Sequence, residues 1–91
     1  MTIVIVNARV RTADPRRVAD GVVVRDGVIV LVGSSAEVRK LAGADATVLD
    51  ARGGVAQGPG GVGLVRGAPA DLDVAIPDGP LVIRAGAIVT A

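Results

Sequence analysis

The chain has 91 residues, enough for one compact domain and too few for two. It contains no aromatic residue, no histidine and no cysteine, and ten basic against nine acidic residues leave a formal net charge of +1. Without stacking surfaces or a basic stripe we expect no nucleic-acid partner. Without histidine or cysteine, an independent active site or a transition-metal site is not expected.

The cysteine count and the start of the chain also bear on its location. The absence of cysteine suits a reducing compartment, so we expect a cytoplasmic protein. The sequence MTIVIVNARV lacks the basic start and long apolar run of a signal peptide, and no later apolar run is long enough for a membrane span. We therefore expect no membrane partner.

In chain order, the first expected element is a strand over residues 3–10, where valine and isoleucine dominate. A turn follows at Asp14-Pro15. The sequence GVVVRDGVIVLVG then predicts two paired strands, 22–25 and 28–32, because Asp26-Gly27 is the residue pair that a type I′ turn prefers. The first third of the chain is therefore predicted to be β structure.

A short helix is expected next. Ser34 and Glu37 have the spacing of a capping box, Val38 lies on the apolar face, and Gly43 ends the helix. A strand over residues 47–49 follows.

The second half begins with a glycine-rich stretch. Residues 52–67 contain so many glycines that neither a helix nor a regular strand is expected there. A strand over 72–76, a turn over 77–80 and a hairpin around Ala85-Gly86 complete the chain. The last hairpin, VIRAGAIV, is similar to the first, VVRDGVIV, and both convergence on good hairpin chemistry and internal duplication account for the likeness.

One motif invites a nucleotide-binding interpretation. Residues 58–63 read GPGGVG, which satisfies the pattern G-x-G-x-x-G, and Asp78 lies about 20 residues further on, where that fingerprint has an acid. Such a site needs a helix that starts after the last glycine, but only three residues separate Gly63 from Gly67. We interpret GPGGVG as a flexible connection instead.

Other candidate residues have simpler explanations. Lys40 follows no glycine cluster and lies on the expected helix, so it is predicted to be a solvated charge. Asp71 and Asp73 alternate along a strand, so their carboxylates share a face, as ligands of a hard cation would, but two exposed carboxylates are typical of a solvated face. Ser34 and Ser35 have no base to activate them, and capping is their expected role. We predict no catalytic, cofactor-binding or metal-binding residue in this chain.

Several stretches resemble, in order, the amidohydrolase superfamily of metal-dependent hydrolases, which includes imidazolonepropionase and cytosine deaminase. VNARVRTAD, DGVVVRDGVIVLVG, SSAEVRKLAG and VLDARGG are similar to the N-terminal segment of these enzymes. RGAPADLDVAI and VIRAGAIV are similar to the C-terminal segment, with its G-x-x-ADL and V-I-x-x-G-x-x-V signatures. The resemblance covers about residues 1–54 and 64–91.

The resemblance implies a mainly β fold, a small antiparallel β-sandwich with one short helix, built from both ends of the chain. In the family a catalytic (β/α) barrel of about 250 residues is inserted between those ends. Here residues 55–63 form a Gly-rich linker in its place, so 1–91 is expected to be a single composite domain. The family continues as P-G-[FL]-[IV]-D-x-H-x-H; this chain has Gly63 at the aspartate position and no histidine after it.

The functional expectations follow from that comparison. No catalytic residue of the family can be transferred to this chain, and a divalent metal such as zinc is expected only in the barrel of full-length members, which hydrolyse C–N bonds in cyclic amides or deaminate their substrates. The chain is expected to be a non-catalytic structural or oligomerisation unit that associates with itself through aliphatic surface. The alternative is an independent small β-barrel module that binds a peptide or a small ligand.

Overall fold

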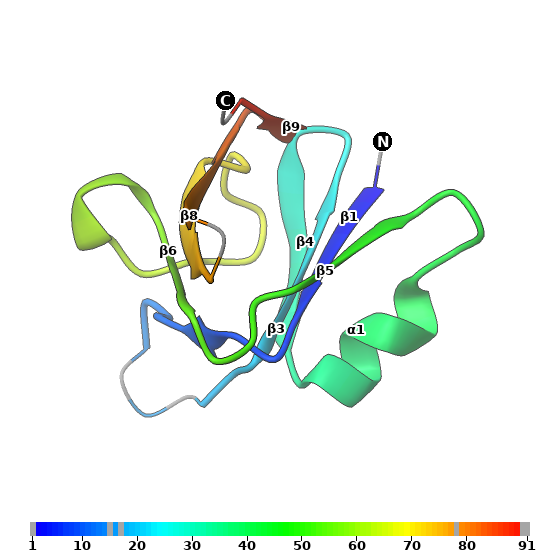
Figure 1. Cartoon of the computed structure of the whole chain (residues 1–91), viewed down its shortest axis with the longest axis horizontal. Coiled ribbons are helices and arrows are strands. Elements are labelled where there is room, and N and C mark those ends of the chain that lie inside the picture. Colours follow the sequence, from blue (N-terminus) through cyan, green and yellow to red (C-terminus); the bar gives the residue numbers. More distant parts are fainter. Residues whose placement is uncertain (1, 15, 17, 78, 90–91) are drawn as a thin grey trace.

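The structure is a computed structural model that describes residues 2–14, 16, 18–77 and 79–89. Sheet A contains β1 (Thr2–Val6), β3 (Gly21–Arg25), β4 (Val28–Gly33) and β5 (Thr47–Asp50) in the order β4-β3-β1-β5. Sheet B contains β2 (Arg9–Val10), β6 (Val55–Gln57), β7 (Leu72–Ile76), β8 (Gly79–Arg84) and β9 (Ala87–Ile88) in the order β2-β6-β7-β8-β9. The helix α1 (Ser35–Leu41) packs on sheet A, so the molecule has three layers (Figure 1).

The mainly β fold with one short α-helix is confirmed, but the sheets are mixed rather than purely antiparallel. β1 pairs in parallel with β5, and β2 pairs in parallel with β6. The cause is the helix: β4, α1 and β5 form a crossover connection that returns the chain to the end of the sheet where β4 started. β5 therefore runs in the direction of β1.

The expected strand over 3–10 is divided between the two sheets. Asn7, with φ 54°, turns the chain out of β1 and into β2. Arg52 and Gly53, with φ 49° and 86°, do the same between β5 and β6. The β1–β2 and β5–β6 connections pass from sheet A to sheet B side by side. They are joined by hydrogen bonds from Gly53 N to Asn7 O (2.7 Å) and from Arg9 N to Gly54 O (2.8 Å). These crossings join sheet A to sheet B at one end of the molecule.

The glycine-rich stretch contains a regular strand, which corrects the expectation for residues 55–63. Val55–Gln57 form β6, which pairs with β2 on one side and with β7 on the other. Three residues carry no local strand signal among so many glycines, and β6 is stabilised by partners that are distant in sequence. The loop proper is limited to the residues after Gln57, which include the 3₁₀ turn η1 (Pro59–Gly61).

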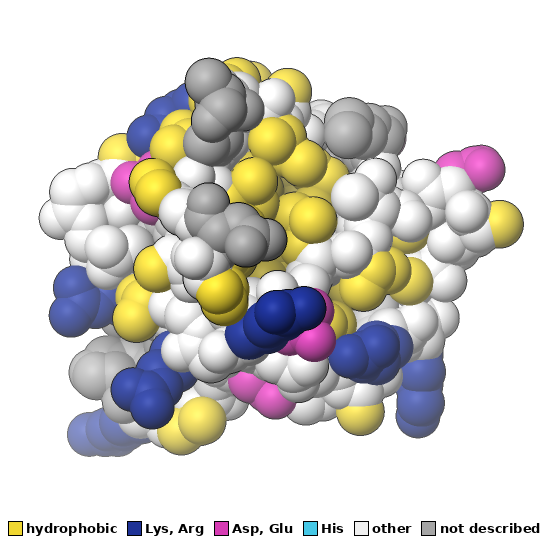
Figure 2. All heavy atoms as spheres, in the orientation of Figure 1, with side chains coloured by type: hydrophobic (Ala, Val, Ile, Leu, Met, Phe, Trp, Pro, Cys, Tyr) yellow, Lys and Arg dark blue, Asp and Glu magenta, His cyan; other side chains and the backbone are white. Residues whose placement is uncertain are grey.

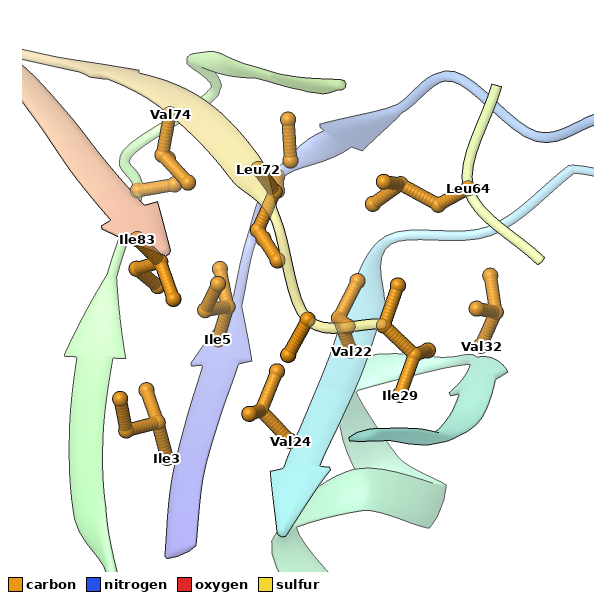
Figure 3. Packing of buried hydrophobic residues seen from close by; sticks show 14 of the residues in the cluster. Ile3, Ile5, Val22, Val24, Ile29, Val32, Leu64, Leu72, Val74 and Ile83 are labelled. Carbon is orange, nitrogen blue, oxygen red and sulfur yellow. The ribbon is translucent and has the colours of Figure 1, made fainter. Parts of the chain in front are cut away.

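Two apolar interiors explain the unbroken apolar run in β1. Alternate residues of β1 face opposite sides of sheet A. Ile3 and Ile5 join the core between the sheets, where Figure 3 shows them pointing toward Leu72 and Ile83 of sheet B. Val4 and Val6 join a second cluster under α1, which includes Val23 of β3 and Val38 of the helix. Both halves of the sequence therefore contribute to one interior: Ile3, Ile5, Ala8, Ala19, Val22, Val24, Ile29, Val32, Ala51, Ala56, Leu64, Ala70, Leu72, Val74 and Ile83.

The two similar hairpins have the same turn and the same register in the two residue pairs next to it. Asp26-Gly27 and Ala85-Gly86 both have positive φ at both positions, as a type I′ turn requires. The tips touch: a Cβ added to Gly86 would lie 2.7 Å from the Cα of Gly27. Ala70 bridges them, since its amide donates to Gly27 O (2.9 Å) and its carbonyl accepts from Gly86 N (3.1 Å). Figure 1 shows this contact at the end of the molecule opposite to the strand crossings.

The expected capping box fixes the start of α1. Ser34 Oγ accepts from the Glu37 amide (3.1 Å), and the Glu37 carboxylate accepts from the Ser34 amide (3.2 Å). Val38 is fully buried against sheet A, close to Gly21, where an added Cβ would lie 2.7 Å from a Val38 methyl group. Within the described residues no helix is long and apolar enough to cross a membrane.

Candidate functional site

The loop at GPGGVG is closed on itself. The Gly58 amide donates to Val62 O (2.7 Å), and the Gly61 amide donates to Gly58 O (3.0 Å). Gly60 and Gly61 have φ 73° and 83°, a conformation that glycine adopts without strain. A dinucleotide turn would present free amides at the start of a helix, but these amides bond within the loop, and no helix starts after η1 in the described part of the chain. This supports the interpretation of the motif as a connection.

The segment that follows the loop is fastened to the N-terminal part of the chain. Leu64 N donates to Arg11 O (2.7 Å), and Leu64 O accepts from Ala13 N (3.2 Å). Gly63 passes so close to the backbone of Thr12 that an added Cβ would lie 2.5 Å from its carbonyl carbon. The chain therefore leaves the sandwich at Gly58 and returns beside it at Val62.

The carboxylates considered as cation ligands have structural partners. Asp71 Oδ1 accepts from the Ala85 amide (2.8 Å) and so supports the second hairpin turn. Asp73 forms an ion pair with Arg84, with 3.0 Å between Oδ1 and Nη2. Among the residues that the structure describes, no group of three or more Asp or Glu side chains is arranged to hold a metal ion.

The serines act in local structure. Ser34 caps α1, and the Ser35 hydroxyl accepts from the Asn7 amide (2.9 Å) while it donates to Asp20 O (3.0 Å). This hydroxyl therefore holds the first strand crossing against the start of the helix. Lys40 is exposed in the last turn of α1, where a positive charge is favourable.

The carboxylate of Asp50 has hydrogen-bond donors close by that affect its pKa. The amide of Arg52 donates to Asp50 Oδ1 (2.9 Å), and this bond, followed by one from the Asn7 side chain, holds the pKa of Asp50 below its ordinary value. The carboxylate is exposed and remains ionised at neutral pH, so its role is to accept hydrogen bonds where β5 turns toward β6.

A cavity that the sequence did not reveal lies on β2 and β6. Its volume is about 630 Å³, and its lining includes Arg9, Arg11, Val18, Asp20 and Gln57. Arg9 pairs with Val55 in the parallel register of β2 and β6, so Arg11 lies beside Gln57 on the same face of sheet B. Arg11 Nη1 also donates to Gly61 O (3.2 Å).

The signal for that cavity in the sequence is weak. Alternate arginines in a strand indicate a shared face, but the placement of Gln57 beside them depends on the strand crossings.

Two further cavities are smaller. One of about 220 Å³ lies beside the loop, between Pro59, Val62 and Leu64 on one side and Ile29 and Pro69 on the other. One of about 260 Å³ lies between the sheets at β5, and its lining consists of Val48, Leu49, Asp50, Arg52, Ile76, Pro77 and Leu81.

Comparison with known proteins gives a likeness in fold alone. No protein-family model matches the chain, and no curated protein matches it significantly. A crystal structure of an uncharacterized metal-dependent hydrolase from Pyrococcus furiosus matches it with a TM-score of 0.55 and 17% sequence identity. The match covers 62% of this chain and 12% of the hydrolase chain. The fold is therefore similar to a small region of a metal-dependent hydrolase.

Proposed function

We propose that the chain is a non-catalytic β-sandwich domain of the kind that flanks the catalytic barrel in metal-dependent hydrolases of the amidohydrolase superfamily. The single observation that carries the proposal is the closed loop at residues 58–62. Gly58 and Val62 are 2.7 Å apart between N and O, so a domain whose own ends lie close together fits between them without separating the strands on either side.

Three further observations support the proposal. The core between the sheets is built from residues before and after the loop, so the parts of the chain on its two sides form one folded unit. Part of that unit is similar in fold to a region of a metal-dependent hydrolase. The carboxylates of Asp71 and Asp73 are engaged in structural bonds, to the Ala85 amide and to Arg84.

In this function the domain supports a neighbouring protein domain, and two copies associate through aliphatic surface. Several valines are exposed outside the two interiors, among them Val48 and Val55. Exposed apolar surface favours contacts between copies. The absence of cysteine supports a reducing compartment such as the cytoplasm.

The proposal predicts that the loop accepts long insertions. A flexible Gly/Ser segment of about 20 residues between Gly60 and Gly61 is expected to lower the free energy of unfolding by only about 1 to 2 kcal/mol, because each doubling of loop length costs about 0.6 kcal/mol. Nothing lies within 4 Å of a Cβ added to Gly60, and the nearest atom to one added to Gly61 belongs to the Arg11 guanidinium (3.1 Å), the end of a flexible side chain. Urea denaturation followed by far-ultraviolet circular dichroism measures the effect, since the chain has no aromatic fluorophore.

The matched control places the same insertion between Asp26 and Gly27. That turn contacts the second hairpin through Gly86 and Ala70, so the insertion there should cost more than the insertion in the loop. Equal losses at the two sites would contradict the proposed insertion site. Stoichiometric zinc binding together with hydrolysis of a cyclic amide by the unaltered chain would contradict the non-catalytic assignment.

A second candidate function is supported by the cavity at Arg9 and Arg11. Two guanidinium groups on one strand face, with the Gln57 amide beside them, are the chemistry that holds a small dicarboxylate. In an NMR titration this function requires that succinate shifts the resonances of Arg9, Arg11 and Gln57, and that the neutral compound 1,4-butanediol does not. Equal responses to both compounds would exclude it.

A further inference from the structure

Three of the four sheet edges are covered or very short. At β4, the Ile29 amide donates to Ala68 O (3.0 Å), and its carbonyl accepts from Gly67 N (2.7 Å). At β2, the Val10 amide donates to Ala19 O (3.3 Å), so the segment before β3 covers that edge. β9 contains two residues. The fourth edge, β5, differs from all of these.

The outer edge of β5 presents backbone groups without partners in the described part of the chain. The Ala51 amide donates to Val6 O (2.9 Å), which places the amides of residues 49 and 51 toward β1. The intervening residues, Val48 and Asp50, therefore point their backbone N–H and C=O groups away from the sheet. No described residue bonds these four groups.

β5 also has little of what normally keeps an edge strand from pairing. Natural edges are protected by charged side chains, above all lysine, and by proline, a bulge or very short length. β5 has no lysine, proline or bulge, and its one charged residue, Asp50, stands at its end. The sequence of β5 is TVLD, and its pairing with β1 is regular over all four residues. Val48, in the middle of the strand, is 47% exposed. The strand is therefore suited to accept another strand.

An opening of mixed character lies at the same edge. The cavity of about 260 Å³ between the sheets is lined by apolar side chains, Leu49 of β5 and Ile76 and Leu81 of sheet B, and also by the charged residues Asp50 and Arg52. Figure 2 shows hydrophobic side chains gathered on the viewed face between the two sheets, where Figure 1 places β5 opposite β8. One added strand beside β5 would meet both the open backbone edge and this apolar surface.

We propose that a second copy of the chain pairs its own β5 with this edge in antiparallel fashion, about a two-fold axis at Val48. This inference deepens the self-association proposed above by naming its surface. A two-fold axis perpendicular to the sheet pairs Val48 with Val48 of the second copy, and Asp50 with Ala46. The Val48 pair supplies both of its own bonds, N–H to C=O in each direction. The Asp50 amide faces the Ala46 carbonyl of the second copy, whereas the Ala46 amide already donates to Gly43 O (3.1 Å) and would exchange that partner for the Asp50 carbonyl.

The charges of β5 agree with this register. Its centre is an uncharged valine pair, and each Asp50 lies opposite an alanine, so no carboxylate faces another across the interface. Leu49 packs on the core side of sheet A. Leu49 and Thr47 of the second copy would lie on that same side and cover the opening next to Ile76 and Leu81.

The contact is small, so the dimer is weak. A single strand pair with its apolar flank falls at the low end of specific interfaces, below about 1,200 Å² in total. We expect a dissociation constant above about 1 μM, so the mass measured by light scattering or sedimentation should rise with concentration. A chain that stays monomeric up to about 1 mM would overturn the inference, since that limit corresponds to only about 4 kcal/mol of binding.

A single cysteine tests the register directly, because the chain has none of its own. In a directly hydrogen-bonded antiparallel pair the Cα atoms are about 5.5 Å apart, within the range that a disulfide spans. Val48→Cys should therefore form covalent dimers under mild oxidation. The matched control is Val65→Cys, which has nearly the same exposure, 44% against 47%, and lies outside β5. Dimer formation at equal rates in both variants would contradict the pairing.

A charge at the centre of the interface provides the second test. In Val48→Lys two like charges meet on the axis, and the dissociation constant should rise at least about tenfold, whereas Val65→Lys should change it less than about twofold. Circular dichroism checks that both variants are folded. If the dimer forms but Val48→Lys leaves it intact, the pairing through β5 is wrong, while self-association through another surface stands. Both results are independent of the loop insertion that tests the domain assignment.

Discussion

Replacement of Gly54 by alanine is expected to unfold the chain or to lower its free energy of unfolding by at least about 3 kcal/mol. Gly54 lies where β5 passes into β6, and a Cβ built there would lie only 1.4 Å from the carbonyl oxygen of Ala75 in β7. That neighbour is backbone in a paired strand, so it cannot move aside as a flexible side chain would. Gly54 also accepts a hydrogen bond from Arg9 N and donates one to Ala51 O.

The effect is large relative to the total stability. For a chain of 91 residues the free energy of unfolding is expected to be about 5 to 14 kcal/mol. Urea denaturation monitored by circular dichroism gives the change. Gly43→Ala is the matched control: nothing lies within 4 Å of its added Cβ, so the change there should be within about 0.5 kcal/mol or slightly stabilising. Similar stability for the two variants would show that β6 does not approach β7 as described.

The second large effect is expected at Ile83, which is fully buried in the core between the sheets. Ile83→Ala should cost about 2 to 5 kcal/mol, the usual range when a buried isoleucine is truncated. The reason is specific to this fold: the side chain comes from the last hairpin, yet it points toward Ile5 in the first strand (Figure 3). The same denaturation measurement applies.

Ile88 is the control within the same hairpin. It is the direct cross-strand partner of Ile83 and is 37% exposed. Ile88→Ala should cost less than about 1 kcal/mol, because its side chain lies outside the shared core. Equal and small losses at both positions would indicate that the last hairpin does not pack on the first strands, and the common interior of the two halves would be disproved.

The elements predicted correctly from the sequence are those with local physical causes. Asp26-Gly27 and Ala85-Gly86 specify their turns because the backbone there needs positive φ. Ser34 and Glu37 specify the start of α1 because their side chains satisfy amides within one turn. In each case the residues that decide the structure are within a few positions of one another.

The elements that the sequence did not predict depend on distant partners. β6 exists because β2 and β7 lie on its two sides, and the division of residues 3–10 depends on the parallel crossing with β5. The cavity at Arg9 and Arg11 has the same origin, since Gln57 reaches it only through β6. A pattern of apolar residues reports which side of a strand is buried, but not which strand lies next to it.

The strand crossings at one end and the touching hairpin tips at the other have a mechanical consequence. Sheets A and B are held together at both ends of their long axis, covalently at the first and by the Ala70 hydrogen bonds at the second. Sliding or rotation of one sheet over the other would break one of these joints. Thermal breathing should therefore be confined to the lateral margins of the sandwich, where β5 borders the opening between the layers. Solvent and partners can reach the interior from that margin while both ends stay closed.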